Sequence, residues 1–229
     1  MERHFDTALR ELKEQLVTMA GLVEKAIEKA IQALQKQDRF MFKEVYEIEK
    51  EVNKAHKSVD ESCVKLLALQ QPMAADLRLI VAIIKINTDL ERMGDQAVNI
   101  AHNSDRYLQG APLKPIVDLP VMSAEVRFMV QETLDSFIKT NEDLARDVLK
   151  RDDKVDTLKN KIFKDVLELM KMDASKVEQG LCLILVARNL ERIGDHATNI
   201  AEDVIYVITG EDVRHSTRVE VIKDVFKQN

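Results

Sequence analysis

Residues 90–95 read Leu90-Glu91-Arg92-Met93-Gly94-Asp95, and residues 190–195 read Leu190-Glu191-Arg192-Ile193-Gly194-Asp195. The two stretches are identical at five of six positions and stand 100 residues apart in a chain of 229 residues. Beyond them the identities continue at the same offset, at Ala97/Ala197, Asn99/Asn199, Ile100/Ile200 and Ala101/Ala201. A repeat of this length indicates a duplicated unit of about 100 residues.

The composition is typical of a protein made of long helices. The chain holds 6 Gly, 4 Pro and no Trp, and 45% of its residues are hydrophobic. These proportions favour an almost all-α fold with ample apolar surface for a core. The net charge of −6 argues against a sequence-independent grip on nucleic acid. Cys63 and Cys182 are isolated, which argues against a zinc site or a disulfide framework.

Apolar residues spaced alternately three and four positions apart predict six amphipathic helices. The first should end near Lys36, the second near Gln70 before Pro72, and the third should run from about residue 73 to 109. In the second copy, the spacing predicts a fourth helix over residues 122–148 and a fifth over 155–169. Asp173 or Ser175 is expected to cap the sixth helix, which should end near Gly210.

The chain is therefore predicted to contain two tandem antiparallel three-helix bundles related by the repeat. Residues 1–110 form the first unit and residues 121–210 the second. Between them lies a linker at residues 111–120 that holds three of the four prolines. The tail at 211–229 has no counterpart and could form a short helix. The sequence contains no secretory leader and no apolar run near the ~20 residues of a membrane span, so we expect a soluble cytoplasmic protein.

The repeated stretch carries two carboxylates one helical turn apart, Glu91 and Asp95, which recur as Glu191 and Asp195. At 100° per residue both lie away from the apolar face of their helix. A simple interpretation is a solvated surface, because Arg92 can reach Asp95 three residues away. The other interpretation is a binding site whose remaining groups come from the preceding helix.

Counting residues outward from the turns favours the binding site. In the second copy, Glu191 and Asp195 should lie level with Asp156 and Asp152 of the fifth helix, since each residue advances about 1.5 Å. In the first copy the opposing pair is Glu49 and Asn53, which supplies one charge fewer. Carboxylates gathered at one level repel each other unless a cation joins them. The predicted metal ligands are Glu191, Asp195, Asp152, Asp156, Glu91, Asp95 and Glu49, with Asn53, Asn99 and Asn199 as supporting groups.

All of these ligand atoms are oxygens, which suit Mg²⁺, Mn²⁺, Ca²⁺ or iron, with Zn²⁺ also open. Glu-x-x-His pairs, the mark of ferritin-type di-iron sites, do not occur. Folding is expected not to depend on the metal, and the second-copy site is expected to be the stronger. The sequence contains no nucleophilic triad, phosphate-binding glycine loop or dinucleotide fingerprint, so enzymatic activity is not suggested.

The two Leu-Glu-Arg-Met/Ile-Gly-Asp stretches, with Gln71-Pro72-Met73-Ala74-Ala75-Asp76-Leu77-Arg78 entering the first, closely resemble the PhoU family. The resemblance covers residues 1–210. It implies a cytoplasmic negative regulator of phosphate homeostasis, often a homodimer, that acts on the ATPase subunit of the Pst phosphate ABC transporter and on the phosphate sensor histidine kinase. It also implies metal-binding E(D)xxxD motifs at Glu91/Asp95, Glu191/Asp195 and Asp152/Asp156. Asn53 departs from this pattern, because an amide closes the motif that begins at Glu49.

Three hypotheses remain at this point. The first is a non-enzymatic regulatory adaptor that reaches the membrane only through its partners and does not bind nucleic acid. The second is a carboxylate-bridged, metal-dependent protein that binds or hydrolyses phosphate compounds, which would need an open metal position and a nearby base. The third is a helical scaffold whose acidic faces are only solvated.

Overall fold

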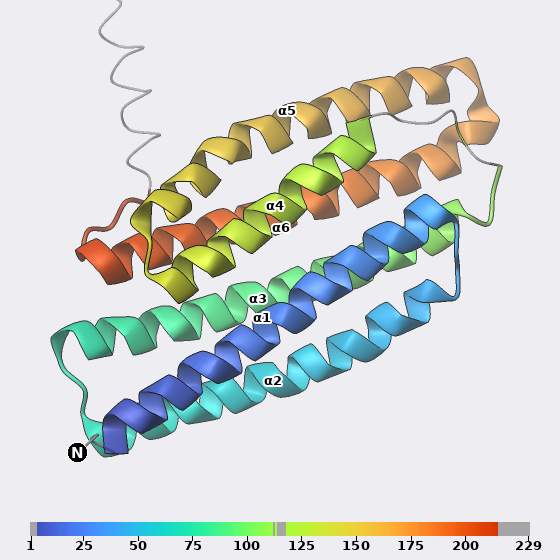
Figure 1. Ribbon diagram of the computed structural model, residues 1–229. Helices are drawn as coiled ribbons and strands as arrows, with labels where there is room; N and C mark the ends of the chain where they lie inside the picture. Colours follow the sequence, from blue (N-terminus) through green and yellow to red (C-terminus); the bar gives the residue numbers. More distant parts are fainter. Residues whose placement is uncertain (1–3, 112, 114–117, 215–229) are drawn as a thin grey trace, which may run out of the picture.

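The computed structural model describes residues 4–111, 113 and 118–214, and within these residues the chain is almost entirely helical (Figure 1). A short 3₁₀ turn, Ala174–Lys176, leads into the last helix. The α-helices are α1 His4–Lys36, α2 Met41–Gln70, α3 Ala74–Tyr107, α4 Asp118–Lys139, α5 Glu142–Met172 and α6 Val177–Thr209. No strand occurs among the described residues, so the predicted all-α fold is confirmed.

The helices form two three-helix bundles, α1–α3 and α4–α6, that lie against one another (Figure 1). The most extensive contact between any two helices of the described chain is that of α3 with α6. Each of these two helices is therefore packed against its own bundle and against its counterpart in the other. The repeated sequence stretches lie on α3 and α6. The two candidate sites are therefore carried by two helices that pack directly against each other.

The bundles form because each helix presents an apolar stripe at helical spacing. Along α1, Leu12, Leu16, Met19 and Val23 are at most 1% exposed. The apolar start of α3 is likewise buried through Ile80 and Ile83. Gly94 lies at a close packing point, where an added Cβ would stand 3.3 Å from Val52 Cγ1. The close neighbour at Gly94 is thus a side chain of α2.

Most helix ends match the predicted turn signals. α1 ends at Lys36 and α2 at Gln70, each followed by a glutamine with positive φ, Gln37 at 55° and Gln71 at 47°. Gly210 follows α6 with φ of 78°, and its N–H donates to the carbonyl of Tyr206. A residue without Cβ adopts this left-handed conformation at little cost, which explains why the helix stops there.

The predicted boundary between the fourth and fifth helices was wrong. Leu144 lies on α5, as does Val148, because the chain turns at Thr140, whose φ is 51°. Asn141 caps α5 by accepting a hydrogen bond from the N–H of Leu144. The apolar spacing continues in phase across this tight turn, so it did not show the break.

Two other features bear on the predicted organisation. α4 begins at Asp118, so residues 118–120, which were assigned to the linker, are helical. Residues 215–229 of the tail lie outside the described part of the chain. No helix in the described residues is long and apolar enough to cross a membrane.

Candidate metal centre

In the second bundle, α5 and α6 bring together four carboxylates, those of Asp152, Asp156, Glu191 and Asp195. Lys159, one turn beyond Asp156 on α5, extends its ammonium between the two helices. Its Nζ lies 2.8 Å from Asp156 Oδ1 and 2.7 Å from Glu191 Oε1. The pairing of α5 with α6 thus brings the four predicted carboxylates to one level. The Lys159 ammonium is an additional cation at the edge of this group.

The pKa values of two aspartates show how closely these charges interact. Desolvation, followed by the charges of Glu191, Asp152 and Asp156, raises the pKa of Asp195 to about 6. Desolvation and the neighbouring charges of Asp156, Asp153 and Glu191 likewise raise the pKa of Asp152. Repulsion among like charges disfavours ionisation of each carboxyl. Lys159 supplies one positive charge against these four carboxylates, so the group as a whole has a net negative charge.

The donor set suits a hard cation, since carboxylate oxygens are the ligands that such ions prefer. In the conformation described, however, no three His, Cys, Asp or Glu side chains of the described residues converge on one point as metal ligands would. Lys159 occupies part of the space between Asp156 and Glu191. An ion joining the four carboxylates would therefore displace this ammonium and draw the side chains inward.

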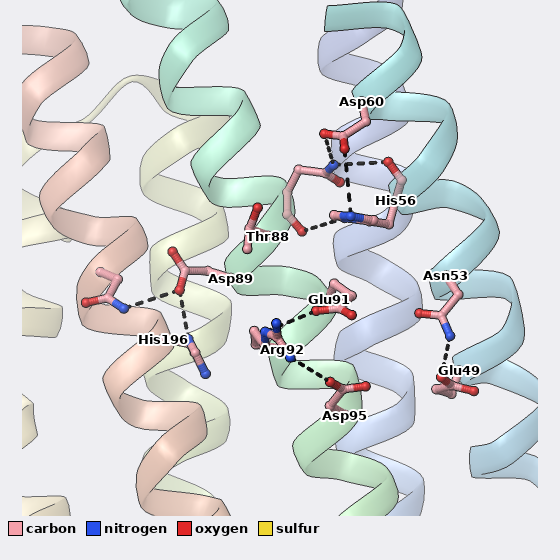
Figure 2. Close-up of polar contacts among 12 residues, drawn as sticks. Glu49, Asn53, His56, Asp60, Thr88, Asp89, Glu91, Arg92, Asp95 and His196 are labelled. Carbon is pink, nitrogen blue, oxygen red and sulfur yellow. Dashed lines mark hydrogen bonds and ion pairs between the residues drawn. The ribbon is translucent and has the colours of Figure 1, made fainter.

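In the first bundle, the corresponding residues lie on facing sides of α2 and α3 (Figure 2). Glu91 and Asp95 point from α3 toward α2, and Asn53 and Glu49 lie at matching heights on α2. Arg92 Nε lies 3.5 Å from Glu91 Oε2, and its Nη1 lies 3.4 Å from Asp95 Oδ2. Asn53 donates a hydrogen bond to Glu49. This face therefore holds three carboxylates and one arginine, whereas the second bundle holds four carboxylates and one lysine.

The comparison with known proteins agrees with this duplicated architecture. The model of the PhoU domain matches the chain twice, over residues 16–104 and 119–204. The chain belongs to the PhoU family. Both matches include the repeated glutamate and aspartate of α3 and α6, so each bundle is one PhoU domain.

Relatives and solved structures in the PhoU family match most of this chain. The phosphate-specific transport system accessory protein PhoU homolog of Pseudomonas aeruginosa is 38% identical over 216 residues, covering 94% of this chain and 89% of its own length. PhoU of Escherichia coli is 34% identical over 211 residues, covering 92% and 88%. The crystal structure of PhoU from Pseudomonas aeruginosa superposes with a TM-score of 0.88 at 38% identity, covering 91% of this chain and all of that one. The PhoU structure from Streptococcus pneumoniae gives 0.84 at 28% identity, covering 92% and 99%.

Two of the three asparagines proposed as supporting groups, Asn99 and Asn199, differ in their surroundings in this PhoU-family chain. The side-chain amide of Asn199 donates to Asp89 Oδ1 across the contact between α3 and α6, at 3.2 Å. Asn199 is thus directed toward the other bundle and away from the carboxylates of α5. The backbone carbonyl of Asn99 accepts a hydrogen bond from the side chain of Asn103, at 2.7 Å.

Sequence reasoning missed two ion pairs that join the PhoU repeats. His196 Nδ1 lies 2.7 Å from Asp89 Oδ1, and both side chains are largely buried (Figure 2). Nearby, Lys85 Nζ lies 3.0 Å from Asp203 Oδ1. Periodicity within one helix does not reveal which residues of α3 meet α6. His196 was the one signal of these contacts in the sequence. It follows Asp195 directly, so its side chain points away from the acidic face and toward a neighbouring helix.

Proposed function

We propose that the protein is a non-catalytic regulator of phosphate uptake and of phosphate-starvation signalling. The observation that carries this proposal is the match of both bundles to the PhoU domain. Curated relatives at 34% to 41% identity, matched over 88% to 94% of their own length, are named phosphate-specific transport system accessory proteins or homologs of them. An accessory role fits a rigid helical scaffold, which offers binding faces without a catalytic constellation.

In this proposal the protein works in the cytoplasm, as a homodimer, on two partners. These are the ATPase subunit of the Pst phosphate ABC transporter and the phosphate sensor histidine kinase. Binding to both would lower transport and kinase signalling when phosphate is plentiful. Two similar domains on one chain support such a role, because they provide two helix faces for two different partner proteins.

The acidic faces are proposed to bind divalent or iron ions, with the second domain as the stronger site. Support comes from the crowding of Asp152, Asp156, Glu191 and Asp195, which raises the pKa of Asp195 to about 6. A bound ion would supply the positive charge that lets all four carboxylates ionise together. Each face has one paired cation, Arg92 or Lys159, but on the first face Asn53 stands in place of a carboxylate, so an ion gains less there.

The experiment is gene replacement in the native host, with a phosphate-starvation reporter read at high and low phosphate. Deletion is expected to leave the reporter active at high phosphate, and the wild-type gene should restore repression. A variant with Glu191→Gln and Asp195→Asn should restore it poorly, whereas exposed Glu168→Gln should behave as wild type. An unchanged reporter in the deletion strain would refute the regulatory role. Metal-dependent turnover of a phosphate ester by the purified protein would contradict the non-catalytic assignment.

A further inference from the structure

A second cluster of possible ligands lies in the first domain, one turn along α2 from Asn53. His56 and Asp60 stand four residues apart on α2, and both side chains turn toward α3 (Figure 2). Asn87 of α3 lies against them, with a side chain that is 0% exposed. The cluster therefore combines an imidazole, a carboxylate and a buried amide from two adjacent helices.

The contacts of His56 fix the position of its ring proton. His56 Nδ1 lies 3.3 Å from the backbone carbonyl oxygen of Asn87. A carbonyl oxygen can only accept, so Nδ1 carries the proton, and in the neutral ring Nε2 keeps an unshared electron pair. Nε2 faces Asp60 Oδ2 at 3.9 Å. In this neutral form of the ring, two acceptor atoms, His56 Nε2 and Asp60 Oδ2, face each other.

Asn87 adds a third acceptor. Its Nδ2 donates to the carbonyl oxygen of His56 at 3.0 Å and to Asp60 Oδ1 at 3.2 Å, which fixes the orientation of the amide. Its Oδ1 is buried and has no hydrogen-bond partner. Oδ1 belongs to the same amide group and lies roughly 2.2 Å from Nδ2 by covalent geometry. A buried acceptor without a donor costs free energy, and a cation bound beside Asn87 would relieve that cost.

We propose that His56 Nε2, the Asp60 carboxylate and Asn87 Oδ1 bind a divalent transition-metal ion such as Zn²⁺. The 3.9 Å between Nε2 and Oδ2 is a distance that one ion can span, since zinc–nitrogen and zinc–oxygen bonds are about 2.0–2.2 Å long. The hydrogen bond from Nδ1 to a carbonyl is the arrangement that orients metal-binding histidines and makes them better donors. One imidazole among oxygen ligands favours a transition ion over Mg²⁺ or Ca²⁺.

This site is separate from the acidic faces and does not depend on the proposed regulatory function. In the repeat register that aligns Val52 with Val155, His56 corresponds to Lys159 and Asp60 to Phe163. The second domain therefore has an ammonium and a phenyl ring at these positions. The transition-metal site is a property of the first domain alone.

The test uses the full-length ¹⁵N-labelled protein carrying Glu91→Gln, Asp95→Asn, Glu191→Gln and Asp195→Asn, so that the acidic faces are weakened. Zn²⁺ is titrated while the histidine ring nitrogens are followed by long-range ¹H–¹⁵N NMR and the affinity by calorimetry. Zn²⁺ is expected to shift His56 Nε2, and His56→Gln should lower the affinity at least about tenfold. His102→Gln, at an exposed histidine of α3, is the matched control and should bind normally.

Asp60→Asn provides a second variant that keeps the shape of the side chain, and circular dichroism verifies that each variant is folded. It too should weaken Zn²⁺ binding while leaving the His102 signals unchanged. A His56 Nε2 resonance that stays in place at saturating Zn²⁺ would overturn the proposal. So would a spectrum at pH 7 in which both His56 nitrogens carry protons, because His56 and Asp60 would then form a simple ion pair.

Discussion

Lys159 Nζ lies 2.7 Å from Glu191 Oε1, so an ammonium of α5 holds a carboxylate of α6. The same Nζ contacts Asp156 Oδ1, and these hydrogen bonds raise the pKa of Lys159 even though desolvation alone would lower it. The lysine thus stabilises the carboxylates in the absence of metal. A metal ion bound at the proposed site would have to compete with this lysine ammonium.

Replacing Lys159 with methionine is expected to strengthen Mn²⁺ binding. The change removes two partly exposed ion pairs, together worth about 1 kcal/mol, so the affinity should rise by up to about fivefold. Calorimetry measures it directly. Lys161→Met is the matched control, because Lys161 lies on the same helix and pairs with Asp118 at 2.9 Å. Equal or weaker binding by the Lys159 variant would show that the ammonium does not compete with metal.

Asp195→Asn is expected to stabilise the metal-free protein at pH 7. The pKa of Asp195 is about 6 in the folded protein against an ordinary 3.8. Between these values the folded state keeps a proton that the unfolded state releases, so stability falls as pH rises from about 4 to 6. The amide cannot ionise and removes this loss.

Urea denaturation in the presence of a chelator, at pH 4 and pH 7, measures the effect of Asp195→Asn. The variant should exceed wild type at pH 7, and its advantage should shrink at pH 4. Glu168→Gln on the exposed face of α5 should follow the wild-type profile. A variant that is less stable than wild type at pH 7 would contradict the repulsion inferred among the four carboxylates.

The two repeated glycines should respond differently to alanine. A Cβ at Gly194 would meet Val155 Cγ1 at 3.7 Å, an ordinary contact, whereas at Gly94 it would stand 3.3 Å from Val52 Cγ1. Alanine is favoured over glycine inside a helix by about 1 kcal/mol. Gly194→Ala should therefore stabilise by about 0.5–1 kcal/mol, and Gly94→Ala should gain less. Urea denaturation of both variants checks the order, and a larger gain at Gly94 would contradict it.

The Asp89–His196 pair is expected to contribute to the joining of the two domains. Asp89→Ala should destabilise the protein by about 1–2 kcal/mol, because it removes a largely buried hydrogen bond to a charged group and leaves His196 unpaired. Asp135→Ala breaks an exposed pair with Lys139 and should cost less than about 0.5 kcal/mol. Chemical denaturation that gives both variants the same stability would show that the Asp89 contact contributes no more than a surface pair.

Much of this fold could be predicted because it depends on periodic burial. The stripes of α1 and α2, the glycine that ends α6 and the proline after α2 are local signals, and each is present in the sequence. Turn counting also placed Asp152 and Asp156 of α5 beside Glu191 and Asp195 of α6. That step succeeded because antiparallel helices joined by a short turn have a fixed register.

Other features depend on contacts that no local pattern encodes. The stripe of α4 continues in phase into α5, so the turn at Thr140 was missed although Asn141 is a favourable cap. The role of Lys159 depends on the reach of a flexible side chain between two helices. The His196–Asp89 pair depends on how α3 and α6 pack across the domain boundary. These interactions required the arrangement of the helices in space.

The central claim is that the second domain carries the stronger site for hard metal ions. Calorimetric titration of Mn²⁺ into two matched variants tests it most directly, one with Glu191→Gln and Asp195→Asn, the other with Glu91→Gln and Asp95→Asn. The first should lose affinity by at least about tenfold, and the second should keep the tightest binding of the wild type. Loss of the tight site only in the Glu91/Asp95 variant, or no Mn²⁺ binding by the wild type, would contradict the claim.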